Sequence, residues 1–267
     1  MNFNKVIIMT DLDGTLLDDE KRISAKDRAA IDDFREGGGL FTVATGRGVA
    51  MARNVVDKLE IDIPCVIFNG AAVYDFRKNQ FLWHSSMPDC ALSYIHTLME
   101  EFPDIGIEIL RGDKVYVVNN NDTVVEHMAI ENVIPEYADA DEVPSDNWLK
   151  VLIAYPPEKL DKVVEFTKHG CNMGVNWVRS SPVYYEMLPE GISKGTGYRK
   201  LLETLGETER FTVASGDFGN DYDMVRAADL GVAVANAQQE VKDAAKLIVS
   251  DNNNSPMSQI IEYIRNL

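Results

Sequence analysis

A short apolar strand that ends in two aspartates constrains this chain more than any other segment. Residues 6–10 read Val-Ile-Ile-Met-Thr, and Asp11-Leu12-Asp13-Gly14 follows directly. Strand residues two apart face the same side, so the two carboxylates can converge just beyond the strand. Ligands of open parallel sheets bind at the carboxyl ends of the strands. Two carboxylates held this close repel each other, so the pair requires a cation between them or a proton on one of them.

Two interpretations of this segment are open on its own residues. In the first, one carboxylate binds a hard cation and attacks an electrophile, while the other donates and recovers a proton. In the second, the segment is an acidic turn in which Gly14 supplies an unusual backbone conformation. The rest of the chain has to decide between a catalytic and a structural role.

Composition excludes several classes of partner. The chain has 267 residues, 45% of them hydrophobic, which is enough for one large core or two moderate ones. A formal net charge of -17 argues against nucleic acid or an anionic membrane as the main partner. An anionic substrate would therefore need a metal ion or a local cluster of basic residues.

Cysteine usage and the N-terminus predict a cytoplasmic protein. The three cysteines, Cys65, Cys90 and Cys171, are odd in number and far apart, which is typical of reduced thiols. The first apolar run is too short for a signal peptide and leads straight into Asp11. No stretch approaches the length of a membrane span. The sequence does not indicate an oligomeric state.

The apolar pattern predicts a parallel sheet wound with helices, interrupted by an insertion. Strands are expected at 6–10, 40–44 and 65–68, with helices after Ser24 and over 49–59, and each strand ends in a polar or glycine-rich turn. Residues 194–267 return to this pattern, with strands expected at 211–215, 230–234 and 247–249. In between, paired strands alternate with helices, and 135–147 is expected to be an acidic loop. We therefore predict a doubly wound, Rossmann-like α/β core from 1–82 and 190–267, with an inserted α+β domain over 83–189.

A second polar constellation lies about two hundred residues after the first. Gly216-Asp217-Phe218-Gly219-Asn220-Asp221 follows an apolar strand, and Lys194 stands at the start of a helix. If the strands are neighbours, Asp11, Asp13, Asp217 and Asp221 meet at one rim, opposite Lys194 and the backbone N–H groups near Thr45-Gly46. Such a site holds a divalent cation and presents donors to a phosphate. Taken singly, however, these segments are an acidic turn that caps a helix and an ordinary exposed lysine.

Together and in order, these segments resemble the haloacid dehalogenase-like phosphatase superfamily. Asp11–Thr15 matches its first motif, Thr45-Gly46-Arg47 its second, Lys194 its third and Gly216–Asp221 its fourth. The insertion is similar to the type-IIB cap of the Cof-like branch, as are Asn69-Gly70-Ala71 and Ile192–Thr196. Members of that branch mostly hydrolyse phosphorylated metabolites.

The resemblance implies a Mg²⁺-dependent phosphatase of small phosphorylated metabolites, with sugar phosphates favoured. It implies Asp11 as the nucleophile that forms an aspartyl-phosphate and Asp13 as the general acid and base. Thr45 and Lys194 would bind the transferring phosphoryl group. The Asp11 carboxylate, the Asp13 backbone carbonyl and the Asp217 carboxylate would hold Mg²⁺, with Asp221 behind the metal or Lys194. The remaining phosphate-binding positions implied are Leu12, Gly46, Arg47, Asn69 and Asn220.

Departures from the family pattern and two rival functions remain. Ala235 stands where relatives usually carry glycine, and Ser255-Pro256 replaces a common Asp-Gly pair. A phosphomutase of sugar phosphates needs the same two aspartates, together with a bisphosphorylated activator. A non-catalytic ligand-binding or regulatory protein is the rival from another class. The cap residues that set specificity cannot be picked from this sequence.

Overall fold

A computed structural model describes residues 2–267, which fold into two compact units. The first contains the chain up to Thr45, Val55–Trp83 and Ser193–Leu267, and the second contains Gly46–Asn54 and His84–Ile192. This division places residues 46–54, expected in the first unit, in the second. Within residues 2–267, no helix has both the length and the apolar character needed to cross a bilayer.

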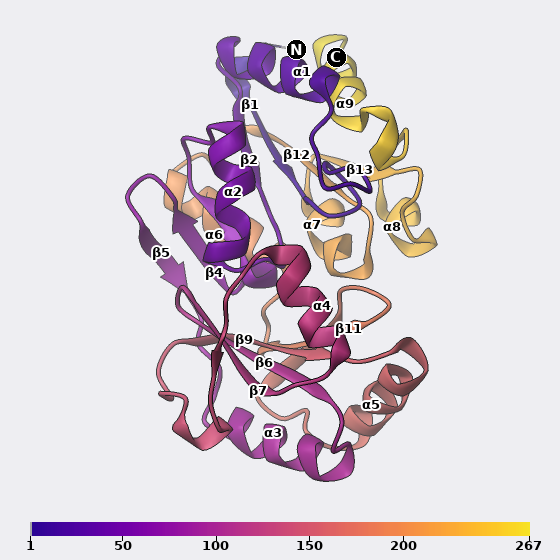
Figure 1. Ribbon diagram of the computed structural model, residues 1–267. Helices are drawn as coiled ribbons and strands as arrows, with labels where there is room; N and C mark the ends of the chain where they lie inside the picture. Colours follow the sequence, from indigo (N-terminus) through magenta and orange to yellow (C-terminus); the bar gives the residue numbers. More distant parts are fainter. Residues whose placement is uncertain (1) are drawn as a thin grey trace. The chain divides into compact units, whose positions relative to one another are not determined.

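The first unit is built on a five-stranded parallel sheet, which confirms the predicted α/β class (Figure 1). From β1 the chain moves outward to β2, and from β12 it moves outward in the opposite direction to β14. The β1/β12 boundary is therefore the point where the strand order reverses, and such points bind ligands in open sheets. All five residues of β1 are buried. In spatial order, the strands are β14 (Leu247–Val249), β13 (Leu230–Val234), β12 (Phe211–Gly216), β1 (Val6–Thr10) and β2 (Leu40–Val43).

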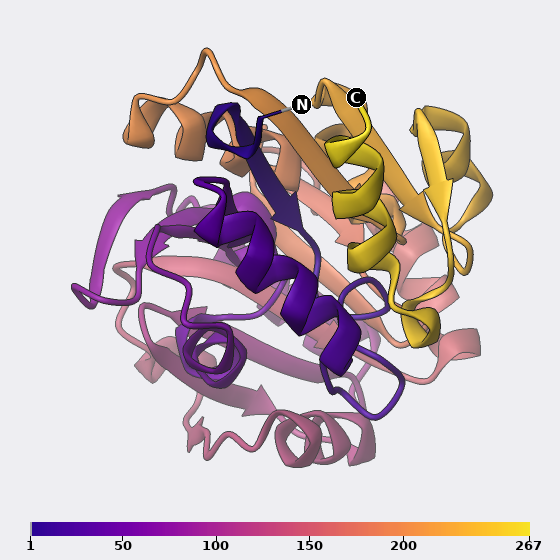
Figure 2. The ribbon, with the colours of Figure 1, turned by 90° about the horizontal axis from the view of Figure 1, so that it is seen from above.

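Helices cover both faces of this sheet. Right-handed crossovers on the two sides of the β1/β12 boundary place α1 and α7 on opposite faces. Figure 2 shows α1 beside the C-terminal helix α9, against which it packs. The ring of Phe34 on α1 is buried and contacts the ring of Phe3. Ser24 caps α1 by accepting a hydrogen bond from the backbone N–H of Asp27 (3.0 Å), as predicted. The helices of this unit are α1 (Ala25–Glu36), α6 (Lys194–Leu205), α7 (Tyr222–Ala227), α8 (Gln239–Ala244) and α9 (Pro256–Arg265). Helix α2 (Val49–Leu59) is divided, with its residues up to Asn54 in the second unit and the rest in the first.

The strand expected at 65–68 differs from its prediction. β3 (Cys65–Ile67) is joined to the residue after β2 by one parallel bridge, between Ala44 and Val66. Its ladder is antiparallel, with β4 (Ala72–Asp75), which in turn pairs with β5 (Gln80–His84). Phe68–Gly70 forms a short 3-10 turn because Asn69 adopts a left-handed conformation (φ 52°) that no strand can continue. Further 3-10 turns are η1 (Phe3–Lys5), η3 (Ala140–Glu142), η4 (Gly219–Asp221) and η5 (Asn252–Asn254).

The second unit is an α+β domain with a six-stranded sheet. Its helices are α3 (Cys90–Glu101), α4 (Asp122–Glu131) and α5 (Pro157–His169). All its strand pairs are antiparallel except β7 with β8. The two-residue strand β8 lies in the expected loop 135–147, and a strand this short leaves no alternating pattern to recognise. In spatial order, the strands are β10 (Val175–Arg179), β11 (Tyr184–Pro189), β9 (Trp148–Ala154), β6 (Gly106–Arg111), β7 (Lys114–Asn119) and β8 (Glu136–Tyr137).

The two faces of the second sheet differ in chemistry. One face carries Ile107, Ile153 and Met187, which belong to an apolar core shared with α3 and α5. Strand alternation puts Glu108, Lys150 and Glu186 on the other face, where register aligns Glu108 and Glu186 on either side of Leu152. These three charged side chains are nonetheless buried. The second sheet therefore has one apolar face and one buried polar face.

Candidate active site

The β1/β12 boundary fixes the first aspartate at the end of its strand. The backbone N–H of Asp11 donates to the carbonyl of Ser215 (2.9 Å), which extends the ladder by one residue. Beside it, the Ser215 hydroxyl donates to the hydroxyl of Thr10 (2.8 Å). These bonds hold the Asp11 backbone rigidly, and its side chain is almost fully buried. A reacting group on a rigid strand end is preorganised.

Lys194 connects the two predicted constellations. Its ammonium donates to Asp11 Oδ1 and to Asp221 Oδ1, both at 2.6 Å, and the lysine side chain is 1% exposed. Ser193 caps the helix that Lys194 begins. Gly70 (φ 99°) lets the start of this helix lie against the 68–70 turn, because a Cβ at position 70 would lie 1.9 Å from the carbonyl oxygen of Ser193. The lysine is thus a buried bridge rather than an exposed surface residue.

The segment after β12 folds back on itself through Asp221. Its Oδ2 accepts hydrogen bonds from the backbone N–H groups of Asp217 (2.9 Å) and Phe218 (3.1 Å). Thr15, from the first motif, donates its hydroxyl to Asp217 Oδ1 (2.8 Å). One carboxylate oxygen each of Asp11, Asp217 and Asp221 lie within 4.8 Å of one another. Three of the four predicted aspartates therefore converge.

Burial and mutual repulsion oppose ionisation in this cluster. Burial raises the pKa of Asp11 well above its ordinary value; the attraction of Lys194 opposes this rise, and the neighbouring carboxylates reinforce it. Burial, followed by repulsion from Asp221, raises the pKa of Asp217 to about 7. Burial alone would lower the pKa of Lys194, but its attraction to Asp11 and Asp221 outweighs burial and raises that pKa.

The donor set fits a hard divalent cation. One ammonium faces three carboxylates, so full ionisation leaves two negative charges uncompensated. Carboxylate oxygens are the ligands that Mg²⁺ prefers, and this cluster contains no sulfur or imidazole ligand among the described residues. Asp11, Asp217 and Asp221 supply the grouped oxygens. Asp221 was expected behind the metal or Lys194, and its oxygens engage Lys194 and two backbone amides.

Asp13 lies apart from this carboxylate group. Its side chain is 36% exposed, and its Oδ1 lies 2.7 Å from the ammonium of Lys21. Gly14 has φ 79°, and a Cβ there would lie 2.6 Å from Asp217 Oδ2, so only glycine allows the turn to pass this close. The two aspartates of the first motif therefore have different surroundings: one is buried against a lysine bridge, and the other is open to solvent.

The predicted phosphate-binding residues fall into two groups. Asn69 and Asn220 meet directly: the Asn220 amide donates to Asn69 Oδ1 (3.0 Å), and the Asn69 N–H donates to the carbonyl of Thr45 (3.0 Å). The side chain of Leu12 is fully buried, so only its backbone could reach a phosphate.

Gly46 and Arg47 belong to the second unit. The Gly46 carbonyl accepts a hydrogen bond from Lys150 (2.6 Å), and Arg47 forms an ion pair with Glu131 at 2.9 Å. The structure thus groups Thr45 with Asn69 and Asn220, and gives Arg47 an acidic partner. A phosphate would have to compete with Glu131 for that guanidinium.

Sequence reasoning missed several residues that support the first motif. Asn236 donates to the carbonyl of Gly14 (2.8 Å), and Asn252 donates to the carbonyl of Leu17 (3.1 Å). Two positions depart from the family pattern. At the first, the Ala235 N–H donates to the Ser250 carbonyl (3.3 Å), and at the second, Ser255 takes a left-handed conformation (φ 54°). The asparagine tract 252–254 was the available signal, since asparagine side chains satisfy loop backbone groups.

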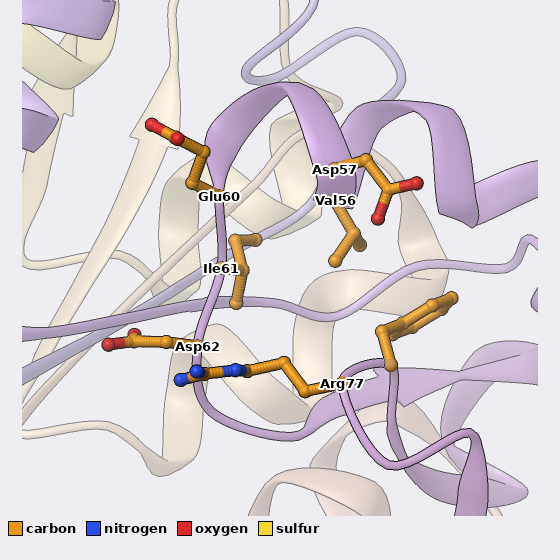
Figure 3. Close-up of a pocket in the computed structure, with 7 residues that line it drawn as sticks. Val56, Asp57, Glu60, Ile61, Asp62 and Arg77 are labelled. Carbon is orange, nitrogen blue, oxygen red and sulfur yellow. The ribbon is translucent and has the colours of Figure 1, made fainter.

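A surface pocket of the first unit does not suit a phosphate. It measures about 400 Å³, and Figure 3 shows Asp57, Glu60 and Asp62 around it with a single arginine, Arg77. Three carboxylates around one guanidinium repel an anion. None of the predicted site residues lines this pocket.

Comparison with known proteins gives the family and the fold. The family described as haloacid dehalogenase-like hydrolase matches residues 8–261. The 5-amino-6-(5-phospho-D-ribitylamino)uracil phosphatase YcsE of Bacillus subtilis is 26% identical over 96% of this chain and 94% of its own. The pyridoxal phosphate phosphatase YbhA of Escherichia coli is 25% identical over 96% and 97%. The solved structure of BT4131, titled a HAD subclass IIB sugar phosphatase, shares the fold with a TM-score of 0.84 at 20% identity, covering 98% of this chain and 99% of that one.

Proposed function

We propose that this chain, which belongs to the haloacid dehalogenase-like hydrolase family, is a Mg²⁺-dependent phosphatase of small phosphorylated metabolites. The observation that carries the proposal is the buried Lys194 bridge between Asp11 and Asp221, beside Asp217 at the reversal point of the sheet. A cationic group among carboxylates at this position can bind a phosphoryl group and neutralise its charge while a carboxylate attacks it.

Asp11 is the proposed nucleophile. A carboxylate oxygen of Asp11 attacks phosphorus, the bond from phosphorus to the leaving oxygen breaks, and that oxygen takes a proton from Asp13. This produces an aspartyl-phosphate and a free alcohol. Asp13 then removes a proton from water as the water oxygen attacks phosphorus. The Asp11 carboxylate departs, and inorganic phosphate is released. Asp13 suits the acid–base role because it is partly open to solvent, which exchanges its proton.

The other residues bind and orient. Lys194 fixes the attacking carboxylate and presents positive charge to the phosphoryl oxygens. Thr45, Asn69 and Asn220 supply polar groups from three neighbouring segments. A divalent cation held by Asp11, Asp217 and the Asp13 carbonyl, with Asp221 adjacent, would add charge neutralisation at the transferring group. Leu12, Gly46 and Arg47 stay proposed phosphate contacts.

The substrate class follows from relatives and from chemistry. YcsE and YbhA are named for phosphate esters of a ribityl chain and of pyridoxal. Both are esters of primary alcohols, whose alkoxides leave poorly without protonation. We propose esters of this kind, sugar phosphates among them, as substrates of this protein. Nucleic acid and membranes are not expected as partners at a net charge of -17.

A panel of metabolite phosphate esters tests the proposal. Phosphate release should require Mg²⁺ and stop in EDTA, and Asp217→Ala should raise the Mg²⁺ concentration for half-maximal activity by about 10–100-fold. Asp113→Ala, in the exposed β6–β7 turn, is the matched control and should leave that concentration unchanged. Full turnover in EDTA would contradict the metal requirement. Turnover only with a bisphosphorylated activator would indicate a mutase, and binding without turnover would indicate a regulatory protein.

A further inference from the structure

The turn after the first motif brings a lysine onto one of the two proposed reacting aspartates. Lys21 Nζ lies 2.7 Å from Asp13 Oδ1. The adjacent Arg22 instead pairs with Asp18 and Glu20 inside the turn. We propose that Lys21 is a positioning residue, which holds the Asp13 carboxyl group where it exchanges a proton with the leaving group. This inference rests on the proposed function, in which Asp13 is the general acid.

The backbone at Lys21 closes the turn from which its side chain reaches Asp13. Lys21 has φ 61°, in the left-handed region that glycine and asparagine occupy at lower cost. Its N–H donates to the carbonyl of Asp18 (2.9 Å), so the conformation belongs to a closed turn. A non-glycine residue keeps a strained conformation only where the surrounding structure holds it. Here the side chain leaves the turn and reaches Asp13.

The turn itself is fastened to η5, the 3-10 turn that follows β14. Asn252 donates to the Leu17 carbonyl (3.1 Å) and to Asp19 Oδ1 (3.0 Å). Asn253 accepts from the Asp19 N–H (3.1 Å) and donates to Asp19 Oδ2 (3.2 Å). Within the turn, Asp18 accepts from the N–H (2.8 Å) and the Nε (3.0 Å) of Arg22. A lysine on so well anchored a turn can direct a carboxylate.

Asp13 needs such direction because it is partly exposed. Proton transfer requires the donor and acceptor atoms to be within hydrogen-bonding distance, and small misplacements lower the rate steeply. An exposed ion pair contributes little to folding stability. Removing Lys21 should therefore affect proton transfer much more than it affects folding, which separates a positioning role from a structural one.

The dependence of rate on the leaving group is the decisive measurement. A primary-alcohol phosphate needs its leaving oxygen protonated, whereas p-nitrophenolate departs readily as an anion. Rates of Asp11 phosphorylation should be measured in the first turnover at saturating ester, for the full-length protein with Mg²⁺. The variants are Lys21→Gly, Lys21→Met and Lys21→Arg, with Asp13→Ala as the reference. Lys26→Met, an exposed lysine in the first turn of α1, controls for the lost charge.

Lys21→Gly is the sharpest variant, since glycine accepts the positive φ and removes only the side chain. We expect it, and Lys21→Met, to slow phosphorylation by the alcohol ester about tenfold. Phosphorylation by p-nitrophenyl phosphate should change less than about twofold, with KM and melting temperature retained. Lys21→Arg should restore the alcohol-ester rate, and Lys26→Met should leave both rates unchanged. Lys21→Gly should add no further loss when combined with Asp13→Ala.

Equal loss with both esters, or a rise in KM alone, would overturn the positioning role and make Lys21 a general attractor of phosphate. An unchanged alcohol-ester rate in Lys21→Gly would also overturn it. Asp13→Ala separates this failure from failure of the proposed function. If Asp13→Ala spares the alcohol ester as well, the acid role of Asp13 is wrong. If only the Lys21 variants spare it, the inference alone fails.

Discussion

Each unit buries a lysine among carboxylates, and the two clusters balance their charges differently. In the second unit, Lys150 pairs with Glu186 (3.0 Å), and His127 of α4 lies 2.8 Å from Glu108. Every acid there has a basic neighbour. In the first unit, Lys194 contacts Asp11 and Asp221, with the Asp217 carboxylate grouped beside them, so one ammonium serves three carboxylates. Burial with mutual repulsion raises the pKa of Asp217 to about 7.

The difference shows how to tell a structural charge cluster from a reactive one. A matched buried pair holds a fold together, although it adds little net stability. An unmatched group of carboxylates is costly unless a cation or a proton joins it. The excess of negative charge, and not burial as such, therefore distinguishes the cluster that we propose to be functional.

The largest effect should come from the unmatched cluster. Asp11→Asn should lower turnover by at least about 10⁴-fold while leaving the fold intact, because an amide cannot act as the nucleophile. Without metal, its melting temperature should equal or exceed that of the parent protein, since one repelling charge is gone.

Stereochemistry at phosphorus checks the role of Asp11 independently. Two successive in-line displacements retain the configuration of a chiral phosphate ester. Inversion would mean that water attacks phosphorus directly, and Asp11 would not be the nucleophile.

The next largest effect should be a loss of folding stability when the matched cluster of the second unit is broken. Lys150→Met leaves Glu186 charged and buried, which should cost about 3–5 kcal/mol of unfolding free energy. Urea unfolding followed by the fluorescence of Trp148 and Trp177, both in the second unit, measures this loss. Lys162→Met, on the exposed side of α5, is the control. Adding Glu186→Leu should recover part of the loss, and strict additivity of the two changes would contradict the pairing.

The smallest effect is a pH dependence confined to the metal-free protein. The pKa of Asp217 is about 7 in the fold and 3.8 ordinarily, so the folded state binds more protons between these values. The contribution of Asp217 to stability should therefore be greatest below about pH 4, fall as pH rises to 7 and level off above it, by at most about 4 kcal/mol. Asp217→Asn should flatten this decline in EDTA. If Asp217→Asn leaves the pH profile unchanged, the proton bound by the folded state is on another carboxylate of the cluster.

The sequence predicted the α/β core well because its signals are local and strong. Five-residue apolar runs such as Val6–Thr10 and capped helices such as α1 are specified by adjacent residues. The convergence of Asp11, Lys194 and Asp217 followed from placing each at the end of a strand or the start of a helix. The two-residue strand β8 and the 3-10 turn at Asn69 depend on tertiary context, and no periodicity marks them.

Side-chain partners were the least predictable part of the site. Nothing in the order Glu20-Lys21-Arg22 tells which base crosses to Asp13 and which stays in the turn, because the left-handed backbone at Lys21 decides it. Likewise, Arg47 matches a phosphate-binding motif, yet its ion pair with Glu131 is set by where α4 lies. Arg179 pairs with Asp161 on α5 (2.6 Å), a contact that its sequence neighbours do not indicate.

The pairing of β1 with β12 also decides when each unit can fold during synthesis. Thr10 and Ser215 meet across a separation of 205 residues, whereas every strand pair of the second sheet lies between residues 106 and 189. A ribosome needs about 10–40 s to add two hundred residues. Through that interval the second sheet can close while the apolar β1 waits without its neighbour, a state that favours aggregation and binding by chaperones. The aspartate at its tip is among the first residues made, and the lysine and aspartates that complete its site are among the last.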